Sequence, residues 1–589
     1  MKTGRITTAL VLLMLVLFGT VAMAGGAKEK AVPEPSAPAA EAQAAEAAVM
    51  ETPQYGGVFN MCQTTSREFM YNPFGDIMLQ GGLMYESFIQ GDWYIPRDKW
   101  EYGGPWFPPE HWAGWLAESW EMNDPATVTI KLRSGIHWWN RPPANGRELV
   151  AADIKKFFMY FLESPKTYKL DLVNIDYIDC PDKYTVVFHL KEPRSDEWLD
   201  FLRGNPTGVL VANADLIEEQ GEEAYNDYLK VIGTGPFIPT EHVSGNYGYW
   251  ASNPGYWKVD KAHDNNKLPY LDGVMCYYMP DEVTRLAALR SGQLDEIHYG
   301  ISPGGQENNW KYVESVAETN PEILSKASPG FPGLLAMNTQ SKPFTDVRVR
   351  QALNMAVNHP AIVKEFYKGH AYLPHLVCPF PPDWGEMSIG EEEWSPIVRE
   401  MFGYNPEKAK QLLAEAGYPD GFDTHVVTVQ QYTKILPYIQ QDLKAIGVNM
   451  EIKVVEWGAH RGMRGKQPQI WCWTEAAGPQ AGSPINILTH AFFYGTDNYG
   501  QWHDPNYEGR LPAAQSLRTA AERNKEYKKL AMYVMEQAPH IFLPAPQLVS
   551  FWQPWVKNFQ GEWGLMKFPG NFVCYFWIDQ ALKKKITGK

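Results

Sequence analysis

The segment from 430 to 457 restricts the fold most strongly, because it places a helix directly before a strand. The run QQYTKILPYIQQDLKA favours a helix that ends at Gly447. After it, Met450, Ile452 and Val454 alternate with polar residues, which is the period of a strand with one buried face. A helix followed by a strand is the repeating unit of layered α/β proteins. We therefore expect an α/β layer in the later half of the chain.

Other segments show the same mixture of elements. TVTIKL (127–132) and TVVFHL (185–190) alternate as strands do, and ELVAADIKKFFMYFLES (148–164) has the apolar spacing of a helix. Another helix is expected to begin after Asn405, which can cap it, and to end at Gly417. The fold class predicted from these patterns is α/β.

The N-terminal segment predicts export. Lys2 and Arg5 precede an apolar stretch at 9–21, and the small residues that follow place the cleavage site after Ala24. There is no Cys beside that site, so we expect no lipid anchor and no membrane insertion after cleavage. The next stretch, 25–54, is rich in Ala, Glu and Pro and predicts a disordered tether.

Composition and motifs argue against several function classes. The net charge of −15 argues against a nucleic-acid partner, which would need clustered Lys and Arg. No phosphate-loop, zinc-protease, nucleophile-elbow or calcium-loop motif is present, so we predict no cofactor, no metal and no enzyme activity. The acidic loop at 260–266 favours a polar surface loop over a calcium site. The six cysteines lack CxxC spacing, and their pairing stays open; they are Cys62, Cys180, Cys276, Cys378, Cys472 and Cys574.

The glycine-rich stretch at 231–257 raises the question of a phosphate-binding loop. Such a loop leads from a strand into a helix whose N-terminus holds the anion. Here Gly233-Thr234-Gly235-Pro236 is followed by alternating aromatic residues, and no Lys is placed to reach a phosphate. We predict a turn into a β-hairpin, which excludes a nucleotide site at this position.

The same stretch resembles a signature of the family 5 extracellular solute-binding proteins, which has a GTGPY turn, a strand and an NPxYW closure. Four further blocks resemble family motifs in the same order, and together they span about residues 55–580. They are GWLAESWE with TIKLRSGIHWWN (114–140), LPYLDGVMCYYMPDEVTRLAALRSGQLDE (268–296), MNTQSKPFTDVRVRQALNMAVN (337–358) and NPEKAKQLLAEAGYPDGF (405–422).

The resemblance implies a large class II periplasmic-binding-protein fold, with two lobes joined by a two-strand hinge and a ligand cleft between them. It also implies a monomeric extracytoplasmic protein that delivers its solute to the permease of an ABC importer. The implied first lobe is formed by 55–66, 227–336 and 543–589. A subdomain at 67–226 is inserted in that lobe, and the second lobe is 337–542.

The ligand is less constrained than the class. Peptide binders of this family often carry an Asp after a Trp in the second lobe, but the matching segment 469–484 contains none. Glu475 is the acid available there to pair with a peptide ammonium. Trp471 and Trp473 lie in the same segment and Trp457 precedes it, and such flat rings suit the apolar faces of sugars.

Two further features bear on the ligand. Asn72 matches an NP motif at the cleft edge of the family and is expected to hydrogen-bond the ligand. A stretch at 91–115, longer than is usual in the family, holds five tryptophans at 93, 100, 106, 112 and 115. We expect an oligosaccharide slightly ahead of an oligopeptide, which is the family default. A small cation, an opine or a metal chelate, and a secreted glycoside hydrolase with paired carboxylates, remain as lesser alternatives.

Overall fold

A computed structural model describes most of the chain beyond residue 50. The described residues are 51–63, 72–73, 81–100, 102, 108–164, 174–192, 199, 202, 209–297, 310–329, 333–373, 387–463, 469–473, 484–485, 488–489, 498–517, 519–562 and 570–588. The chain divides into Met1–Thr52 and Pro53–Lys589, and the described helices and strands belong to the second unit. The predicted signal peptide and nearly all of the predicted tether lie outside the described residues.

The first sheet contains four strands in the order β1-β12-β9-β8. β1 (Val58–Gln63) is parallel to β12 (Gly273–Tyr278). β8 (Phe237–Val243) and β9 (Tyr247–Ser252) form an antiparallel hairpin, so the turn predicted at GTGP is confirmed.

The glycines of that turn serve close packing of the backbone. Gly235 N donates a hydrogen bond to Met84 O at 2.9 Å, beside helix α1 (Gly81–Met84). A Cβ on Gly233 would lie 2.0 Å from the same oxygen, which no side chain tolerates.

The inserted subdomain contains an antiparallel sheet in the order β4-β5-β7-β6. Its strands are β4 (Ala117–Asp124), β5 (Thr127–Leu132), β6 (Ile175–Asp182) and β7 (Thr185–Leu190). Helix α2 (Ala151–Glu163) packs on β6 and β7. Its predicted apolar side is confirmed by the burial of Ile154, Phe157, Phe158 and Phe161.

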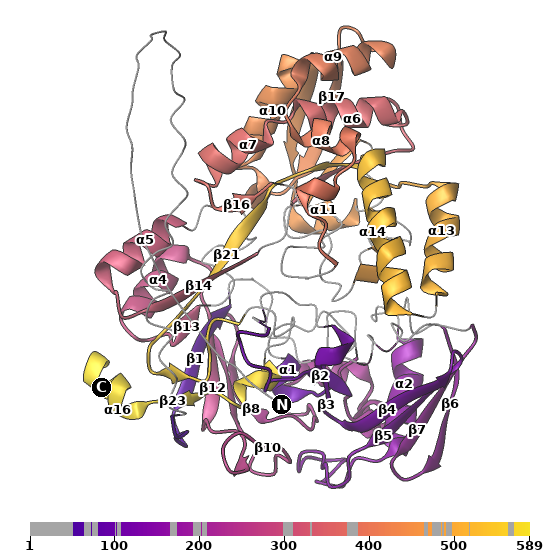
Figure 1. Cartoon of the computed structure of the whole chain (residues 1–589). Helices are drawn as coiled ribbons and strands as arrows, with labels where there is room; N and C mark the ends of the chain where they lie inside the picture. Colours follow the sequence, from indigo (N-terminus) through magenta and orange to yellow (C-terminus); the bar gives the residue numbers. More distant parts are fainter. Residues whose placement is uncertain are drawn as a thin grey trace, which may run out of the picture. The chain divides into compact units, whose positions relative to one another are not determined.

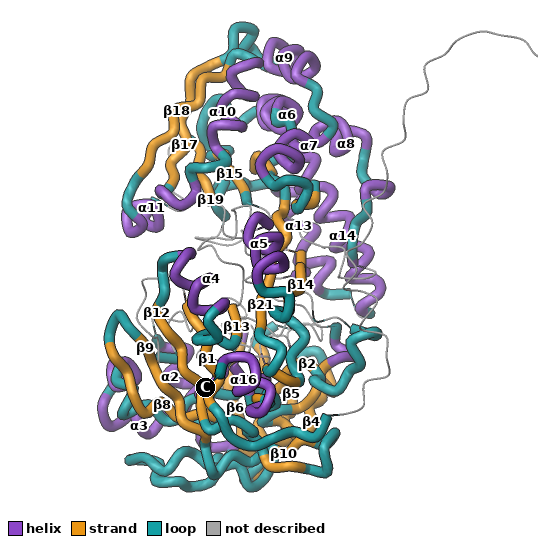
Figure 2. Tube along the Cα trace, turned by 90° about the vertical axis from the view of Figure 1, so that its left-hand side faces the viewer, coloured by secondary structure: helices purple, strands orange, loops and turns teal. Residues whose placement is uncertain are grey.

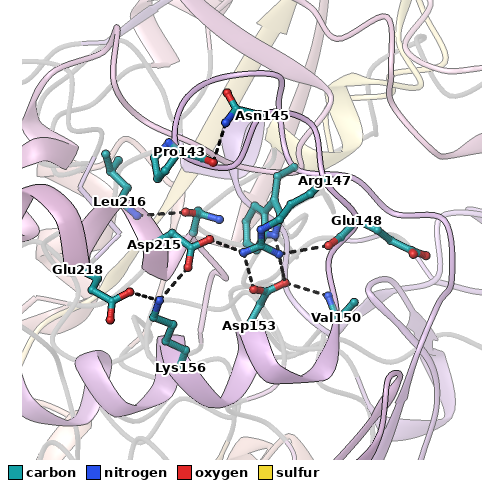
Figure 3. A network of polar contacts seen from close by, with 12 residues as sticks. Pro143, Asn145, Arg147, Glu148, Val150, Asp153, Lys156, Asp215, Leu216 and Glu218 are labelled. Carbon is teal, nitrogen blue, oxygen red and sulfur yellow. Dashed lines mark hydrogen bonds and ion pairs between the residues drawn. The ribbon is translucent and has the colours of Figure 1, made fainter.

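A charged network ties α2 to α3 (Ala214–Gln220), as Figure 3 shows. Arg147 donates to both oxygens of Asp153 at 2.6 and 2.7 Å and also bonds Asp215. Lys156 donates to Asp215 at 2.8 Å and contacts Glu218. Burial works against ionisation of Asp215, but the bonds from Lys156 and Arg147 outweigh it and hold the pKa of this carboxyl below its usual value.

The second lobe contains the sheet β18-β17-β19-β15-β20. Its strands are β15 (Leu334–Met337), β17 (Phe422–Thr428), β18 (Val448–Val454), β19 (Ile470–Trp473) and β20 (His540–Phe542). Helices α6 (Val347–Ala356), α9 (Pro406–Glu415) and α10 (Leu436–Ala445) lie beside it in Figure 2, with α10 packed on β18 and α6 on β20.

The local predictions for this lobe hold. Asn405 caps α9 by accepting a hydrogen bond from Lys408 N at 3.1 Å, and Gly417 after the helix has a φ of 93°. The helix-then-strand pair predicted at 430–457 is α10 followed by β18, which runs parallel to β17.

A further sheet has four strands, with the order β13-β21-β14 and the short strand β16 also paired to β21. These are β13 (Glu296–Ile297), β14 (Leu324–Pro329), β16 (Ala371–Tyr372) and β21 (Ala545–Trp552). The other described elements are α4 (Glu282–Arg290), α5 (Trp310–Thr319), α7 (His359–Ala361), α8 (Pro396–Phe402), α11 (Trp457–Gly462), α13 (Pro505–Gln515), α14 (Ala520–Gln537), α15 (Gly570–Val573), α16 (Gln580–Thr587), β2 (Ile89–Gly91), β3 (Trp112–Gly114), β10 (Val259–Asp260), β11 (Asn266–Lys267), β22 (Val556–Lys557) and β23 (Trp577–Ile578).

The described apolar residues form three cores. One gathers side chains between Leu334 and Leu543, a second those between Phe59 and Cys276 together with Trp552–Ile578, and a third centres on Leu289 and Phe551. The residue ranges predicted for the two lobes and the subdomain stay a prediction. Within the described residues, no helix is long and apolar enough to cross a membrane. The five described cysteines form no disulfide with one another, and Cys378 lies outside the described residues.

The charged network of the subdomain predicts an acid-sensitive contribution to stability. Replacing Asp215 by Asn should lower the free energy of unfolding by about 1–2 kcal/mol at pH 7. Since the pKa of Asp215 is depressed by folding, this contribution exists above the unfolded pKa near ~4 and is lost as pH falls below it. Urea denaturation at pH 7 and pH 3 measures it. The control is Glu218→Gln, whose carboxylate is 58% exposed and should change stability by less than about 0.5 kcal/mol. An equal loss at both pH values would contradict the ionic origin.

Candidate functional site

Two antiparallel chain crossings join the β13-β21-β14 sheet to the second-lobe sheet. β14 pairs with β21 over six residues, and the continuations of both strands pair again as β15 and β20. Between the two ladders, Leu543 N donates to Gly333 O at 3.1 Å. β21 is the long yellow strand of Figure 1. These crossings lie where the resemblance to the family implied a two-strand hinge.

A third segment from the second lobe also binds the hinge. β16 pairs with the start of β21, and Gln547 N donates to His370 O at 3.0 Å. The side chain of Gln547 donates to the hydroxyl of Tyr372 at 3.1 Å. Burial lowers the pKa of His370, and the nearby Glu314 opposes that shift. The arrangement offers hydrogen-bonding groups beside the hinge.

The carboxyl ends of three parallel strands meet at one edge of the second-lobe sheet. Thr428 of β17 lies opposite Val454 of β18, and β19 runs beside them in the same direction. β19 ends at Trp473, which is paired with Leu334, the first residue of β15 after the hinge crossing. In open α/β sheets ligands bind at the carboxyl ends of the strands. This edge next to the hinge, from here on the β19 edge, is the candidate ligand site.

Two of the predicted stacking residues belong to the β19 edge. Trp473 is the last residue of β19, and Trp457 begins α11, three residues after β18. The side chains of both lie outside the described part of the structure, as does all of Glu475. The fold therefore brings two of the predicted positions to one edge, and their contact with a ligand stays a prediction.

Trp471 is placed differently from the other two. Its side chain is fully buried and stacks on His460, with ring centroids 4.6 Å apart and planes 13° apart, and Tyr499 packs against it at 5.0 Å. Its indole N–H donates to the carbonyl of His460 at 3.1 Å. Trp471 is therefore part of the core of the second lobe, and its contacts with His460 hold β19 against α11. Its predicted stacking on a ligand stays untested.

Asn72 makes its hydrogen bonds inside the subdomain. It is 5% exposed, and its amide donates to Glu222 O at 3.2 Å and to Asn226 Oδ1 at 3.3 Å. Both partners belong to the short helix Glu222–Asn226. The described contacts thus anchor residues 72–73 to that helix, and a contact of Asn72 with a ligand stays a prediction.

The described tryptophans of the 91–115 stretch pack largely into the core formed by residues between Phe59 and Cys276 together with Trp552–Ile578. Trp93 is 5% exposed and stacks on Tyr575 at 5.6 Å and 14°, and Trp115 is buried against Phe572. Trp100 and Trp112 are partly buried against the same core, and residue 106 lies outside the described residues. The described tryptophans of this stretch thus pack the core against the C-terminal segment.

Glu86 is a buried acid that was not among the residues predicted from the sequence. The carboxylate of Glu86 has no exposed surface and accepts hydrogen bonds from Trp115 Nε1 at 2.6 Å, Tyr256 OH at 2.9 Å and Trp257 Nε1 at 3.1 Å. Burial raises its pKa, against the hydrogen bonds and the nearby Lys258. A single acid inside the apolar run GGLMYESFI was the available signal.

A comparison with protein-family models decides the class of the chain. The model of bacterial extracellular solute-binding proteins, family 5 (middle), matches residues 111–499, which is well over half of the chain. The chain is a family 5 solute-binding protein. The membership inferred from the sequence motifs is confirmed.

Curated relatives of this solute-binding protein are named for several solutes. Heme-binding protein A of Haemophilus influenzae is 28% identical over 78% of this chain and 83% of its own length. The glutathione-binding protein GsiB of Pectobacterium atrosepticum is 28% identical over 74% of this chain and 80% of that protein. The dipeptide-binding protein of Escherichia coli is 27% identical over 73% of this chain and 80% of that protein. All three are binding proteins by name.

Solved structures show the same fold. The periplasmic binding protein DppA from Helicobacter pylori, in complex with the peptide STSA, superposes with a TM-score of 0.70 at 24% identity, over 89% of this chain and 99% of that one. AgaA of A. tumefaciens R10, in complex with agropinic acid, gives 0.68 at 21% identity, over 89% and 99%. The two-lobed α/β binding-protein fold predicted from the sequence is therefore confirmed.

The burial of Trp471 predicts a structural role that can be separated from binding. Trp471→Ala should lower the free energy of unfolding by about 3–5 kcal/mol, because it leaves a cavity beside His460 and Tyr499. Trp471→Phe keeps most of the packing and should cost about 1–2 kcal/mol. Urea denaturation measures both. If Trp471→Ala were as stable as the native protein, the core placement of the indole would be wrong.

Proposed function

We propose that this family 5 protein is an extracytoplasmic binding subunit that captures short peptides or peptide-like solutes and delivers them to an ABC permease. The observation that carries the ligand class is the set of similar proteins. Relatives named for a dipeptide and for glutathione each cover about three quarters of the chain. The export signal predicted from the sequence and the extracellular character of the family fit this role.

The role is one of binding and release. The relatives are named as binding proteins. Ligand held between two lobes stabilises their closed arrangement by its differential affinity for that state. The hinge of paired strands permits such rotation while both sheets keep their internal register. A permease can then distinguish the loaded from the empty protein by the relative position of the lobes.

The ligand contacts are proposed at the β19 edge. Trp457 and Trp473 provide flat apolar faces for side chains of the solute, and Glu475 pairs with its α-ammonium. Trp471, buried behind this edge, holds β19 against His460. Asn72 is kept as a lesser candidate, since its described amide bonds are all made within the subdomain.

The oligosaccharide hypothesis receives less support than the peptide hypothesis. It rested on the density of tryptophan in two segments. In the 91–115 stretch that density accompanies core packing, and the similar proteins named above are not named for sugars. A glycoside hydrolase gains no support from relatives that are binding proteins. The peptide class is therefore the better proposal.

A thermal-shift screen tests the ligand class. The purified protein is screened against one pool of di- to hexapeptides and one pool of di- to hexasaccharides. We expect the peptide pool alone to raise the melting temperature, because a ligand at about a hundred times its Kd adds about 2.7 kcal/mol of stability. A rise with the sugar pool alone would return the oligosaccharide hypothesis to first place and overturn this proposal.

The role of Glu475 predicts a dependence on the free N-terminus of the peptide. N-acetylation of a bound peptide should weaken its binding about tenfold or more, and Glu475→Gln should abolish most of that difference. Isothermal titration with matched free and acetylated peptides measures it. The control is Glu451→Gln on β18, an exposed acid paired with Lys453, which should leave both affinities unchanged. If Glu475→Gln kept the full preference for the free amine, another group would bind it.

The role of Trp473 predicts a loss of affinity on truncation. Trp473→Ala should weaken peptide binding by about fivefold or more, since a lost stacking contact costs about 1 kcal/mol or more. Trp112→Ala in the 91–115 stretch is the matched control and should leave affinity unchanged. A change of less than about twofold for Trp473→Ala would remove this residue from the site.

A further inference from the structure

Three aromatic rings of the first lobe surround the ammonium of one lysine. Lys258 Nζ lies 2.7 Å from the ring centroid of Trp115, 5.5 Å from that of Trp257 and 5.7 Å from that of Tyr575. The rings come from three distant parts of the chain: the end of the 91–115 stretch, the NPGYW closure and the segment after α15. Aromatic faces arranged around a cation are the usual recognition site for organic ammonium groups.

The acid beside these rings strengthens their attraction for a cation. Glu86 accepts the indole N–H groups of Trp115 and Trp257, so its carboxyl oxygens lie at the edges of both rings. Donation into a carboxylate polarises an indole and makes its face more negative. Trp115 therefore links the acid and the lysine, with Glu86 at its N–H and Lys258 over its face.

The ammonium that occupies this cage contacts ring faces and forms no ion pair among the described residues. In the described part of the chain the Lys258 ammonium is paired with ring faces, and no carboxylate lies within ion-pair distance of it. Lys258 and Trp257 are partly buried, whereas Trp115 and Tyr575 are almost fully covered, so the cage reaches solvent on the side of Trp257, where Arg133 also lies 5.6 Å from the ring centroid. A four-carbon stem with rotatable bonds can carry the ammonium out to water.

We propose that Trp115, Trp257 and Tyr575, together with Glu86, form a binding site for an organic quaternary ammonium group, which Lys258 occupies in this structure and vacates when such a cation binds. The site is separate from the proposed peptide site, because none of its residues belongs to the β19 edge. A small cation, which the sequence analysis kept as a lesser alternative ligand, would bind at this site.

The protonation of Lys258 makes this site sensitive to pH. Burial lowers the pKa of Lys258 to about 7, with Arg133 and Lys261 adding to the shift and Cys574 and Glu86 opposing it. Below this pH the charged lysine competes for the ring faces. Above it the neutral amine loses most of its attraction to them, whereas a quaternary cation keeps its charge at every pH.

The probe is tetramethylammonium, which cannot donate a hydrogen bond and so reports on the ring faces. Binding is followed by the quenching of tryptophan fluorescence, with sodium at equal concentration as the salt control and tert-butanol as the neutral control. For the native protein, the affinity should rise by up to about tenfold from pH 6 to pH 8, as the competing charged fraction falls. This measurement needs no variant.

Variants isolate the residues of the cage. Lys258→Ala should bind tetramethylammonium about tenfold more tightly than the native protein at pH 6 and should lose the pH dependence. Lys261→Ala, a matched change three residues along the chain, should behave as the native protein. Trp257→Leu in the Lys258→Ala background should remove the binding. The proposal is overturned if the native affinity is the same at pH 6 and pH 8, or if tert-butanol quenches as effectively as the cation.

Discussion

The structure depends on one mechanical constraint, which is that the two lobe sheets share a pair of antiparallel chain crossings. The ladder β14–β21, the bond between Leu543 and Gly333 and the ladder β15–β20 form an almost continuous series of backbone hydrogen bonds. A paired ribbon of this kind resists sliding, because a slip of one residue would turn every side chain to the opposite face. Rotation of one lobe against the other must therefore occur by bending or twisting of this ribbon.

This constraint explains why the β19 edge is suited to ligand capture. β19 is paired with β15 immediately after the crossing, and Trp473 lies opposite Leu334, the first residue of β15. A solute bound at the proposed site would lie beside these crossings, and each contact that it made with the other lobe would favour closure. The third attachment, β16 on β21, brings Gln547 and Tyr372 to the same region. Changes in their hydrogen bonding would alter the cost of rotation without touching the solute.

Much of the fold follows from signals within a few residues of each element, whereas the burial of the tryptophans in β19 does not. The GTGP turn, the cap at Asn405 and the helix before β18 depend on neighbours within a few residues, and each was predicted correctly. In β19, alternation places Trp471 and Trp473 on the same face of the strand, but it cannot show which of them is covered. Trp471 is covered by His460 and Tyr499, and those contacts depend on how α11 and a later segment pack. Burial of this kind is a property of the assembled lobe.

The burial of the tryptophans in the 91–115 stretch also could not be predicted from the sequence. The structure gives a physical reason for one of them, Trp115. Their partners, Phe572 and Tyr575, lie more than 450 residues further along the chain, so composition alone favoured a role for these tryptophans in binding an oligosaccharide. The structure supplies a different reason. Glu86 is buried among the aromatic residues that link the 91–115 stretch to the C-terminal segment, where an unpaired carboxylate would be very costly. Side chains with one N–H or O–H donor and a mainly apolar surface can satisfy it there. Indole and phenol groups are the side chains with both properties, and Trp115, Tyr256 and Trp257 meet this need together. Burial of Glu86 therefore requires aromatic hydrogen-bond donors around it. The electron-rich faces of two of these donors, Trp115 and Trp257, then attract the ammonium of Lys258.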